Sequence, residues 1–195
     1  MTGELAAAVG VDDDLVPTLL AALAGRHLTV ATAESLTGGL LAALLTEVPG
    51  SSAVVRGGVV VAATDLKPSL AGVDDALLAS SGAVDPEVAR QLAAGVRVRC
   101  AADVGIGLTG VAGPDPQDGA AVGTWYCALA GPGGYCDERA ALPGAGAPDD
   151  GADPELEPGR VVEGFARPQR GRRLIRAAAV RAALEMLSNI PATIS

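Results

Sequence analysis

Two short glycine-rich segments contain most of the residues that could do chemistry. They are Ser35-Leu-Thr-Gly-Gly39 and Thr109-Gly-Val-Ala-Gly113, and each follows an apolar, β-rich stretch. In an open α/β sheet, ligands gather at the carboxyl ends of strands, where loops and helix N-termini converge. Ser35 would there lie near unpaired backbone N–H groups, which can stabilise an oxyanion. The sequence leaves two roles open for Ser35, a nucleophile or a simple helix cap.

A serine nucleophile needs a base that takes its proton. The single histidine, His27, lies at the start of the first predicted strand, whereas Ser35 follows its end, so the more economical candidate is Lys67, the one lysine in the chain. Arginine cannot serve as the base, because its pKa stays above about 12. Burial, in contrast, can lower the pKa of a lysine by a few units. The alternative for Lys67 is an ordinary solvated residue in a loop.

The glycine-rich segments match no standard hydrolase or nucleotide fingerprint. Ala33 stands where G-x-S-x-G has its first glycine, and no Walker A motif occurs. Gly105, Gly107 and Gly110 fit the spacing of G-x-G-x-x-G, but they lie inside a predicted strand rather than at its end, so we do not expect a dinucleotide site there. A single histidine also excludes a multi-histidine metal site.

Composition excludes further classes of function. The chain has 195 residues, which suits one domain. A net charge of −9 disfavours nucleic-acid binding, and 2% aromatic residues leave almost no stacking platform for single strands. No run of about 18 apolar residues occurs, so we expect no membrane span. Because the N-terminus has no basic segment and the three cysteines form no C-x-x-C pair, we expect a cytoplasmic protein with reduced thiols.

Hydrophobic patterning predicts an α/β layered domain over residues 12–190, after a flexible leader at 1–11. Strands are predicted at 27–33, 59–61, 103–108 and 122–130, with further strands near 135–142 and 161–165. Helices are predicted from Leu15 to Leu23, at 40–45, in short pieces within 64–82, from Pro86 behind an Asp85 cap, and at 172–187. The segment 143–160 is rich in Gly, Pro and acidic residues, which predicts a surface insertion.

Several motifs occur in the order that is typical of one known family. They are Ala33-Glu-Ser-Leu-Thr-Gly-Gly39, Val48-Pro-Gly-Ser-Ser52, Gly57-Gly58, Lys67, Gly82-Ala-Val84, Thr109-Gly-Val-Ala-Gly-Pro114 and Val122-Gly-Thr124. Together they resemble the CinA C-terminal domain family, the competence/damage-inducible-type proteins, from about residue 15 to 130 and again at 165–187. The resemblance implies a three-layer α/β/α sandwich with a mixed sheet, in its stand-alone form.

The resemblance also implies an activity, because many family members are nicotinamide-nucleotide amidohydrolases. They convert nicotinamide mononucleotide to nicotinic acid mononucleotide and ammonia, without a metal or cofactor. By resemblance Ser35 is the nucleophile and Lys67 its base. The last helix of the family usually begins at a G-D-R-like turn, which makes Arg172 the candidate for the substrate phosphate. The remaining substrate-binding candidates are Thr37, Gly38, Gly39, Thr109 and Gly110.

Other interpretations stay open. The family commonly has a tyrosine where this chain has Ala62 and Ala63, and Pro68 follows Lys67 directly, which biases Lys67 away from helical dihedrals. The missing tyrosine and the acidic insertion favour a catalytically degenerate member that binds a nucleotide or a protein; a related amidase with another small substrate is a third reading. Glu34 could serve in the site or hold the loop through backbone bonds. The Ala/Leu-rich helices would suit a homo-oligomer.

Overall fold

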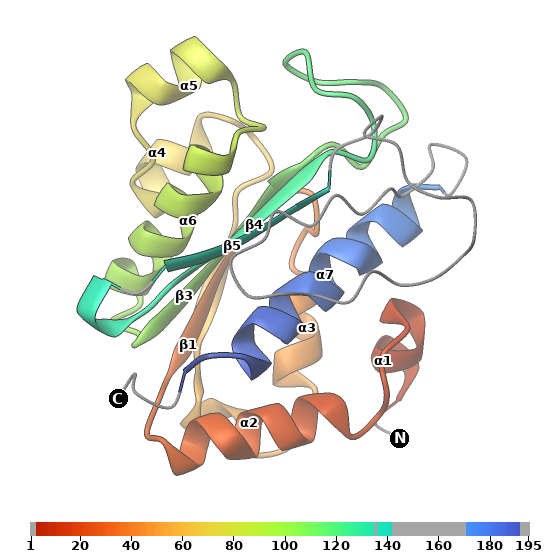
Figure 1. Ribbon diagram of the computed structural model, residues 1–195, viewed down its shortest axis with the longest axis vertical. Coiled ribbons are helices and arrows are strands. Elements are labelled where there is room, and N and C mark those ends of the chain that lie inside the picture. The colour runs from red at the N-terminus through yellow and green to blue at the C-terminus, as the bar shows by residue number, and fades with distance from the viewer. Residues whose placement is uncertain (1–2, 135, 142–170, 192–195) are drawn as a thin grey trace.

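The computed structural model describes residues 3–134, 136–141 and 171–191, and these form one mixed sheet with helices on both faces (Figure 1). The strands are β1 (Val30–Glu34), β2 (Val55–Val60), β3 (Val104–Gly110), β4 (Trp125–Ala130) and β5 (Cys136–Ala141). The helices are α1 (Glu4–Val9), α2 (Leu15–Gly25), α3 (Leu40–Thr46), α4 (Leu66–Ala71), α5 (Asp75–Ser81), α6 (Pro86–Arg99) and α7 (Arg172–Ser188). Short 3-10 turns lie at Ser51–Ala53 and Pro132–Gly134.

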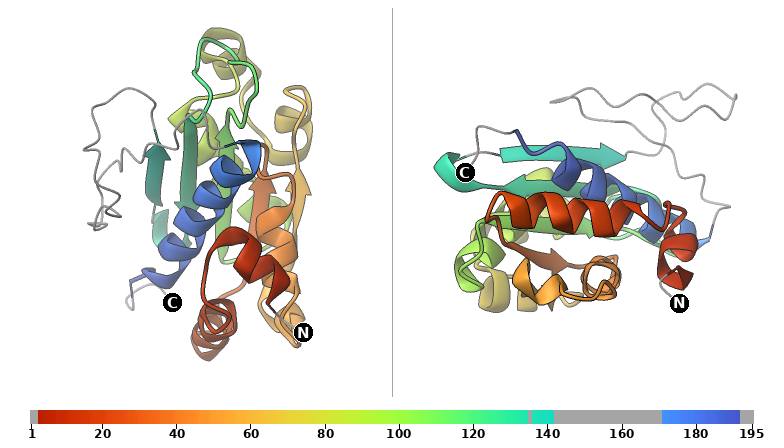
Figure 2. Two further views of the ribbon diagram at one scale, coloured as in Figure 1. Left: turned by 90° about the vertical axis from the view of Figure 1, so that its right-hand side faces the viewer. Right: turned by 90° about the horizontal axis from the view of Figure 1, so that it is seen from below.

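The sheet has the order β2-β1-β3-β4-β5. Strand β1 pairs in parallel with β2 and β3, whereas β3, β4 and β5 pair antiparallel. Helices α1, α2, α3 and α7 cover one face, and α4, α5 and α6 cover the other (Figures 1 and 2). The structure therefore confirms the expected α/β/α sandwich with a mixed sheet.

The strand order reverses at β1, and this reversal positions the site. From β1 it passes through α3 on one face to β2, and from β2 it returns through α4, α5 and α6 on the other face to β3. The order of strands thus reverses at β1, and ligands of open α/β sheets bind outside the carboxyl end of the strand at such a point. Residue Ser35 follows β1 directly.

The glycines of β3 are explained by helix packing. A Cβ atom on Gly105 would lie 2.0 Å from the carbonyl oxygen of Ala93, and one on Gly107 would lie 2.2 Å from that of Ala89. The missing side chains therefore let α6 pack directly against the strand backbone. The G-x-G-x-x-G spacing here reflects this close approach, in agreement with its position inside a strand.

The predicted leader differs from the structure. Glu4–Val9 form helix α1, in which Ala6 and Val9 are buried in the main hydrophobic cluster. Arg181 of α7 donates a hydrogen bond of 2.7 Å to the carbonyl oxygen of Val9, which fixes the end of α1. Helix α1 is thus held by a contact with α7, 172 positions away in the sequence. The local composition of residues 1–11 does not reveal such a contact. The insertion predicted at 143–160 and the strand predicted at 161–165 lie outside the described residues.

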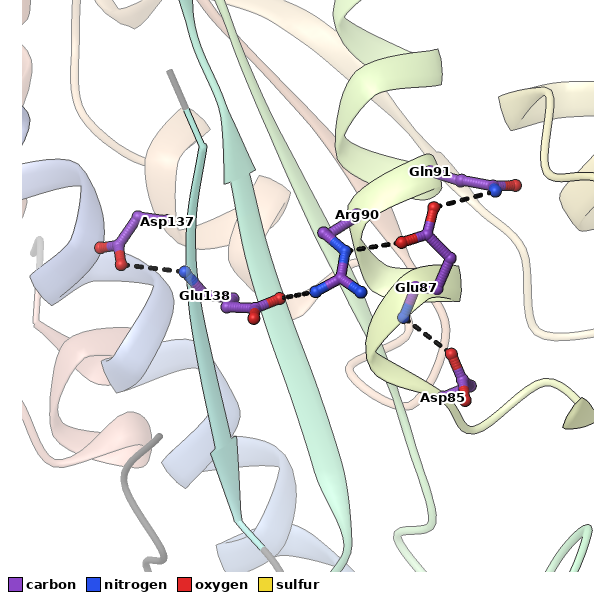
Figure 3. Close-up of polar contacts among 6 residues, drawn as sticks. All are labelled: Asp85, Glu87, Arg90, Gln91, Asp137 and Glu138. Atoms are coloured by element: carbon purple, nitrogen blue, oxygen red, sulfur yellow. Dashed lines mark hydrogen bonds and ion pairs between the residues drawn. The ribbon is translucent and has the colours of Figure 1, made fainter. Parts of the chain in front are cut away.

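Polar contacts link α6 to the edge strand β5 (Figure 3). Arg90 lies between Glu87 on its own helix, at 2.7 Å, and Glu138 on β5, at 2.5 Å. The Asp85 carboxylate accepts the Glu87 amide at 2.7 Å, which confirms the predicted cap of α6. Because these ion pairs are partly exposed, each contributes at most about 1 kcal/mol. The backbone hydrogen bonds between β4 and β5 therefore contribute more than these ion pairs to holding β5 in the sheet.

Candidate active site

Ser35 stands at the carboxyl end of β1, where the chain leaves the sheet. Its amide donates a hydrogen bond of 2.9 Å to the carbonyl oxygen of Leu108 on β3. A tight turn follows, in which the Gly38 amide donates to the carbonyl oxygen of Ser35 at 3.1 Å. Gly38 and Gly39 have φ values of 59° and 87°, a left-handed conformation that glycine adopts without the Cβ penalty. The sequence thus places a half-buried serine on a sharp strand-to-helix turn.

Glu34 holds the helix that follows this turn. Its carboxylate is fully buried and accepts the amides of Leu41 and Ala42, at 3.1 and 2.8 Å, and the hydroxyl of Thr32 at 3.2 Å. It therefore supplies the cap that Gly39, at the N-terminus of α3, cannot provide. The sequence left two roles open for Glu34, a group of the site or a support of the loop through backbone bonds. The structure shows the bonds to the backbone.

Lys67 lies against Ser35 on the α4 side of the sheet. Its Nζ atom is 3.3 Å from Ser35 Oγ and donates a hydrogen bond of 2.8 Å to the carbonyl oxygen of Val61. The side chain is only 1% exposed. The solvated-loop interpretation of Lys67 is therefore wrong, and Lys67 is helical despite the bias expected from Pro68. Both residues lie in the first turn of α4, where the ring of a proline displaces no helical hydrogen bond.

The surroundings of Lys67 change its proton affinity. Burial lowers the pKa of Lys67 below its ordinary value of 10.5, because the charged ammonium loses its hydration. The carboxylates of Asp118 and Asp65 act in the opposite direction and raise the pKa in part. A lysine with a lowered pKa is more often neutral near pH 7, which is the state that can accept a proton from Ser35.

Thr109 joins two loops beside the site. Its buried hydroxyl donates a hydrogen bond of 2.6 Å to the carbonyl oxygen of Ala83. The Ala83 amide donates to the carboxylate of Asp118 at 2.9 Å, so the short 82–84 loop is held from both sides. The single hydroxyl proton of Thr109 is thus engaged, and only its lone pairs are left for a substrate. Its predicted contact with substrate stays a prediction.

The first turns of α7 approach the site from the opposite face. Arg172 is exposed, and its Nη1 atom donates a hydrogen bond of 2.7 Å to the carbonyl oxygen of Gly113. Arg176 donates through Nε and Nη2 to the carbonyl oxygen of Thr37, at 3.2 and 2.5 Å. Arg176 was not among the predicted site residues, although its i, i+4 spacing from Arg172 indicates a shared helix face.

The remaining predicted site residues fall near the same end of the sheet, with different surroundings. Thr37 is fully buried, and its hydroxyl has no partner among the described residues. Gly110 has a φ of 156°, and a Cβ atom on it would lie 2.6 Å from the carbonyl oxygen of Thr124, so it serves close strand packing. Ala62 and Ala63 lie exposed between β2 and α4.

Within residues 3–134, 136–141 and 171–191, no group of three His, Cys, Asp or Glu side chains is arranged to hold a metal ion. Across the same ranges, no helix has the length and apolar character needed to cross a membrane.

The described residues form an α/β/α sandwich with a serine on the turn after β1 and a buried lysine beside it. Comparison with known sequences shows which protein family has this arrangement. The model of the CinA C-terminal domain matches residues 12–147, well over half of the chain. The chain therefore belongs to the CinA C-terminal domain family, as the resemblance implied.

Individual relatives agree with this assignment. A CinA-like protein of Frankia casuarinae is 52% identical over 135 residues, which are 69% of this chain and 31% of that protein. A putative competence-damage inducible protein of a Geobacillus species is 46% identical over 134 residues, 68% of this chain and 32% of its own length. The chain thus matches about a third of the length of these relatives.

Solved structures share the fold. The competence/damage inducible protein CihA of Agrobacterium tumefaciens superposes with a TM-score of 0.71 at 34% identity, covering 90% of this chain and 92% of that one. A CinA superfamily protein of Escherichia coli gives a TM-score of 0.73 at 28% identity, with coverages of 90% and 87%.

Proposed function

We propose that this chain is an amidohydrolase that converts nicotinamide mononucleotide to nicotinic acid mononucleotide and ammonia. The observation that carries the proposal is the approach of the buried Lys67 Nζ atom to Ser35 Oγ, at 3.3 Å. This pair lies at the carboxyl end of β1, where open α/β sheets bind ligands. The choice of substrate is supported by the family resemblance, since many members of the CinA C-terminal domain family are nicotinamide-nucleotide amidohydrolases.

In the proposed reaction, neutral Lys67 accepts the hydroxyl proton of Ser35 while Ser35 Oγ attacks the carbonyl carbon of the nicotinamide amide. The hydrogen bond that Lys67 donates to the Val61 carbonyl oxygen keeps Nζ beside Ser35. The tetrahedral intermediate collapses, ammonia leaves with a proton returned from Lys67, and an ester to Ser35 is formed. Water then hydrolyses this ester and restores the free serine. Both steps use acyl-transfer chemistry and a single proton shuttle.

Stabilisation of the oxyanion would come from the turn after Ser35. The backbone amides of Leu36 and Thr37 donate no hydrogen bond to any other described residue, and amides close to a nucleophilic serine are typical donors to a developing oxyanion. Removal of one such donor costs about 10²–10³ in rate in a characterised hydrolase. The turn is therefore as much a part of the proposed mechanism as the Ser35–Lys67 pair.

For the phosphate of the substrate we propose Arg172. Its guanidinium has five N–H donors, of which one goes to the Gly113 carbonyl oxygen, and the side chain is exposed at the N-terminus of the long helix α7. A helix N-terminus adds about 0.3–1 kcal/mol of attraction for an anion, and a guanidinium adds directed hydrogen bonds. Arg172 would thus lower KM more than it raises kcat.

The test is product formation by the purified chain, with ammonia and nicotinic acid mononucleotide both quantified. We expect equal amounts of the two products from the wild type and no release by Ser35→Ala. Ser80→Ala, an exposed serine on α5, is the matched control and should keep the wild-type rate. Full activity of Ser35→Ala would contradict the assigned nucleophile.

A second function is favoured by Ala62 and Ala63, which leave the stretch next to Lys67 without a phenol hydroxyl. It is a nucleotide-binding module without turnover. If the wild type releases no ammonia but nicotinamide mononucleotide raises its melting temperature, this second function is the correct one. The same samples therefore distinguish the two.

A further inference from the structure

Arg176 bonds to the serine turn on the side opposite to Lys67. Two donors of one guanidinium, Nε and Nη2, converge on the carbonyl oxygen of Thr37, at 3.2 and 2.5 Å. The two residues are 139 positions apart in the sequence, so α7 reaches the turn only through the fold. A guanidinium has a fixed fork of donors, and two bonds to one oxygen define both its position and its direction.

Few other hydrogen bonds hold the backbone of the turn. Gly38 and Gly39 lack side chains and have left-handed φ values, which leaves the backbone after Thr37 with the largest conformational freedom. The Thr37 carbonyl oxygen also accepts the Leu40 amide at 3.2 Å, and the Thr37 hydroxyl has no partner among the described residues. Within the part of the chain that the structure describes, Arg176 is the one side chain that bonds to the backbone of residues 36–39.

The place of Thr37 in the turn connects this contact to the nucleophile. Thr37 lies two residues after Ser35, and the Gly38 amide closes the turn onto the Ser35 carbonyl oxygen at 3.1 Å. A rotation of the peptide between Thr37 and Gly38 would move this amide and, with it, Ser35 and the amides of Leu36 and Thr37. Misplacement of a reacting group by about 1 Å can cost about 10² in rate.

We propose that Arg176 is a positioning residue of the active site, which fixes the serine turn through the Thr37 carbonyl oxygen so that Ser35 faces Lys67. The proposal rests on the proposed function for its catalytic readout. It assigns Arg176 no contact with substrate, so its removal should lower kcat and leave KM nearly unchanged. A residue that bound the substrate phosphate would have the opposite signature, a raised KM with kcat preserved.

The chain offers a matched control. Arg181, one turn and a residue further along α7, makes the same kind of bond, from Nη1 to the carbonyl oxygen of Val9 at 2.7 Å, but at helix α1. Arg181→Met and Arg176→Met therefore remove the same charge and the same chemistry from one helix. Both variants should fold, and melting temperatures would show the structural cost of each loss.

With nicotinamide mononucleotide as substrate, we expect Arg176→Met to lower kcat about 10- to 100-fold with KM changed by less than about threefold. Arg176→Lys keeps the charge but loses the planar fork of donors, so its kcat should lie between those of Arg176→Met and the wild type. Arg181→Met should keep the wild-type kcat. An equal loss of kcat in both Met variants, an unchanged kcat in Arg176→Met, or a change confined to KM would overturn the proposal.

A second measurement does not depend on the substrate. A small neutral sulfonyl fluoride sulfonylates an activated serine: the oxygen–sulfur bond forms, the sulfur–fluorine bond breaks, and fluoride leaves with the serine proton taken by the base. The rate of labelling at Ser35, read by intact mass, should fall about 10-fold or more in Arg176→Met and stay unchanged in Arg181→Met. Equal rates in both variants would overturn the positioning role, even if nicotinamide mononucleotide were not the substrate.

Discussion

The Nζ atom of Lys67 lies 3.3 Å from the Oγ atom of Ser35, although 32 residues separate the two along the chain. Ser35 arrives at the end of a parallel strand and Lys67 on the first turn of a short helix that follows the neighbouring strand. Because the lysine is buried, its charge is costly, and its proton is held less tightly than in water. The pair therefore has the short distance and the lowered lysine pKa that the proposed nucleophile and base require.

The first prediction concerns pH. Lys67 must be neutral to accept a proton, so kcat/KM should rise with pH as Lys67 deprotonates and fall as pH drops below its pKa. Since burial lowers the pKa of Lys67, the midpoint of this limb should lie below 10.5. The measurement is kcat/KM across pH with nicotinamide mononucleotide. Lys67→Arg, which stays protonated, should lose about 10²–10⁴ in kcat/KM at every pH; a small loss would contradict the role of Lys67 as base.

The second prediction concerns Asp118. Its carboxylate raises the pKa of Lys67, so Asp118→Asn should lower that pKa and move the acidic limb of kcat/KM to lower pH. The asparagine Oδ1 atom can still accept the Ala83 amide, which preserves the loop contact. Asp115→Asn, an exposed residue of the same loop, should leave the limb in place. A shift to higher pH in Asp118→Asn, or equal shifts in both variants, would count against this electrostatic coupling.

The third prediction concerns the cap of α3. Glu34→Gln replaces one of the two accepting oxygens with an NH2 donor. The glutamine side chain therefore cannot accept the amides of both Leu41 and Ala42 as the two carboxylate oxygens do. We expect a loss of about 1–2 kcal/mol in the free energy of unfolding, measured by urea denaturation. Glu47→Gln, at the C-terminal end of the same helix, removes a charge that the helix dipole disfavours, so it should be neutral or slightly stabilising. Similar losses in both variants would refute the capping role.

The fourth prediction concerns the glycines of β3. Gly107→Ala should lower the free energy of unfolding by about 1–3 kcal/mol, because the new methyl group would meet the backbone of Ala89 and Ala93. Gly25→Ala has no atom within 4 Å of the new Cβ and ends helix α2, so it should be neutral or stabilising by up to about 1 kcal/mol. Thermal unfolding of both variants checks this, and a stable Gly107→Ala would contradict the packing explanation.

Local signals in the sequence predicted the features that are local in the structure. The Asp85-Pro86 pair predicted the start of α6, and the apolar run at 40–45 predicted α3 almost to the residue. Strand β3 was likewise predicted within two residues at its C-terminal end. These features are set by caps and periodicity, which depend on a few neighbouring residues.

Features that depend on distant contacts were not predictable in this way. Helix α1 forms where a leader was expected, since its apolar side is covered by α7. The sequence named Lys67 as the candidate base because it is the one lysine in the chain, but it left a solvated loop position open. Arg176 was not among the predicted site residues, because its partner Thr37 lies 139 residues away. In each case the tertiary contact, rather than the local pattern, determines the environment of the residue.

The most direct test of the central claim is to identify the acylated residue. Wild-type protein is mixed with nicotinamide mononucleotide, quenched in acid during turnover, digested and mapped by mass. The Ser35–Lys67 mechanism predicts an adduct with the mass of the substrate minus ammonia on the peptide that contains Ser35, present in Ser80→Ala and absent in Ser35→Ala. An adduct on another residue, or ammonia release by Ser35→Ala at the wild-type rate, would contradict it.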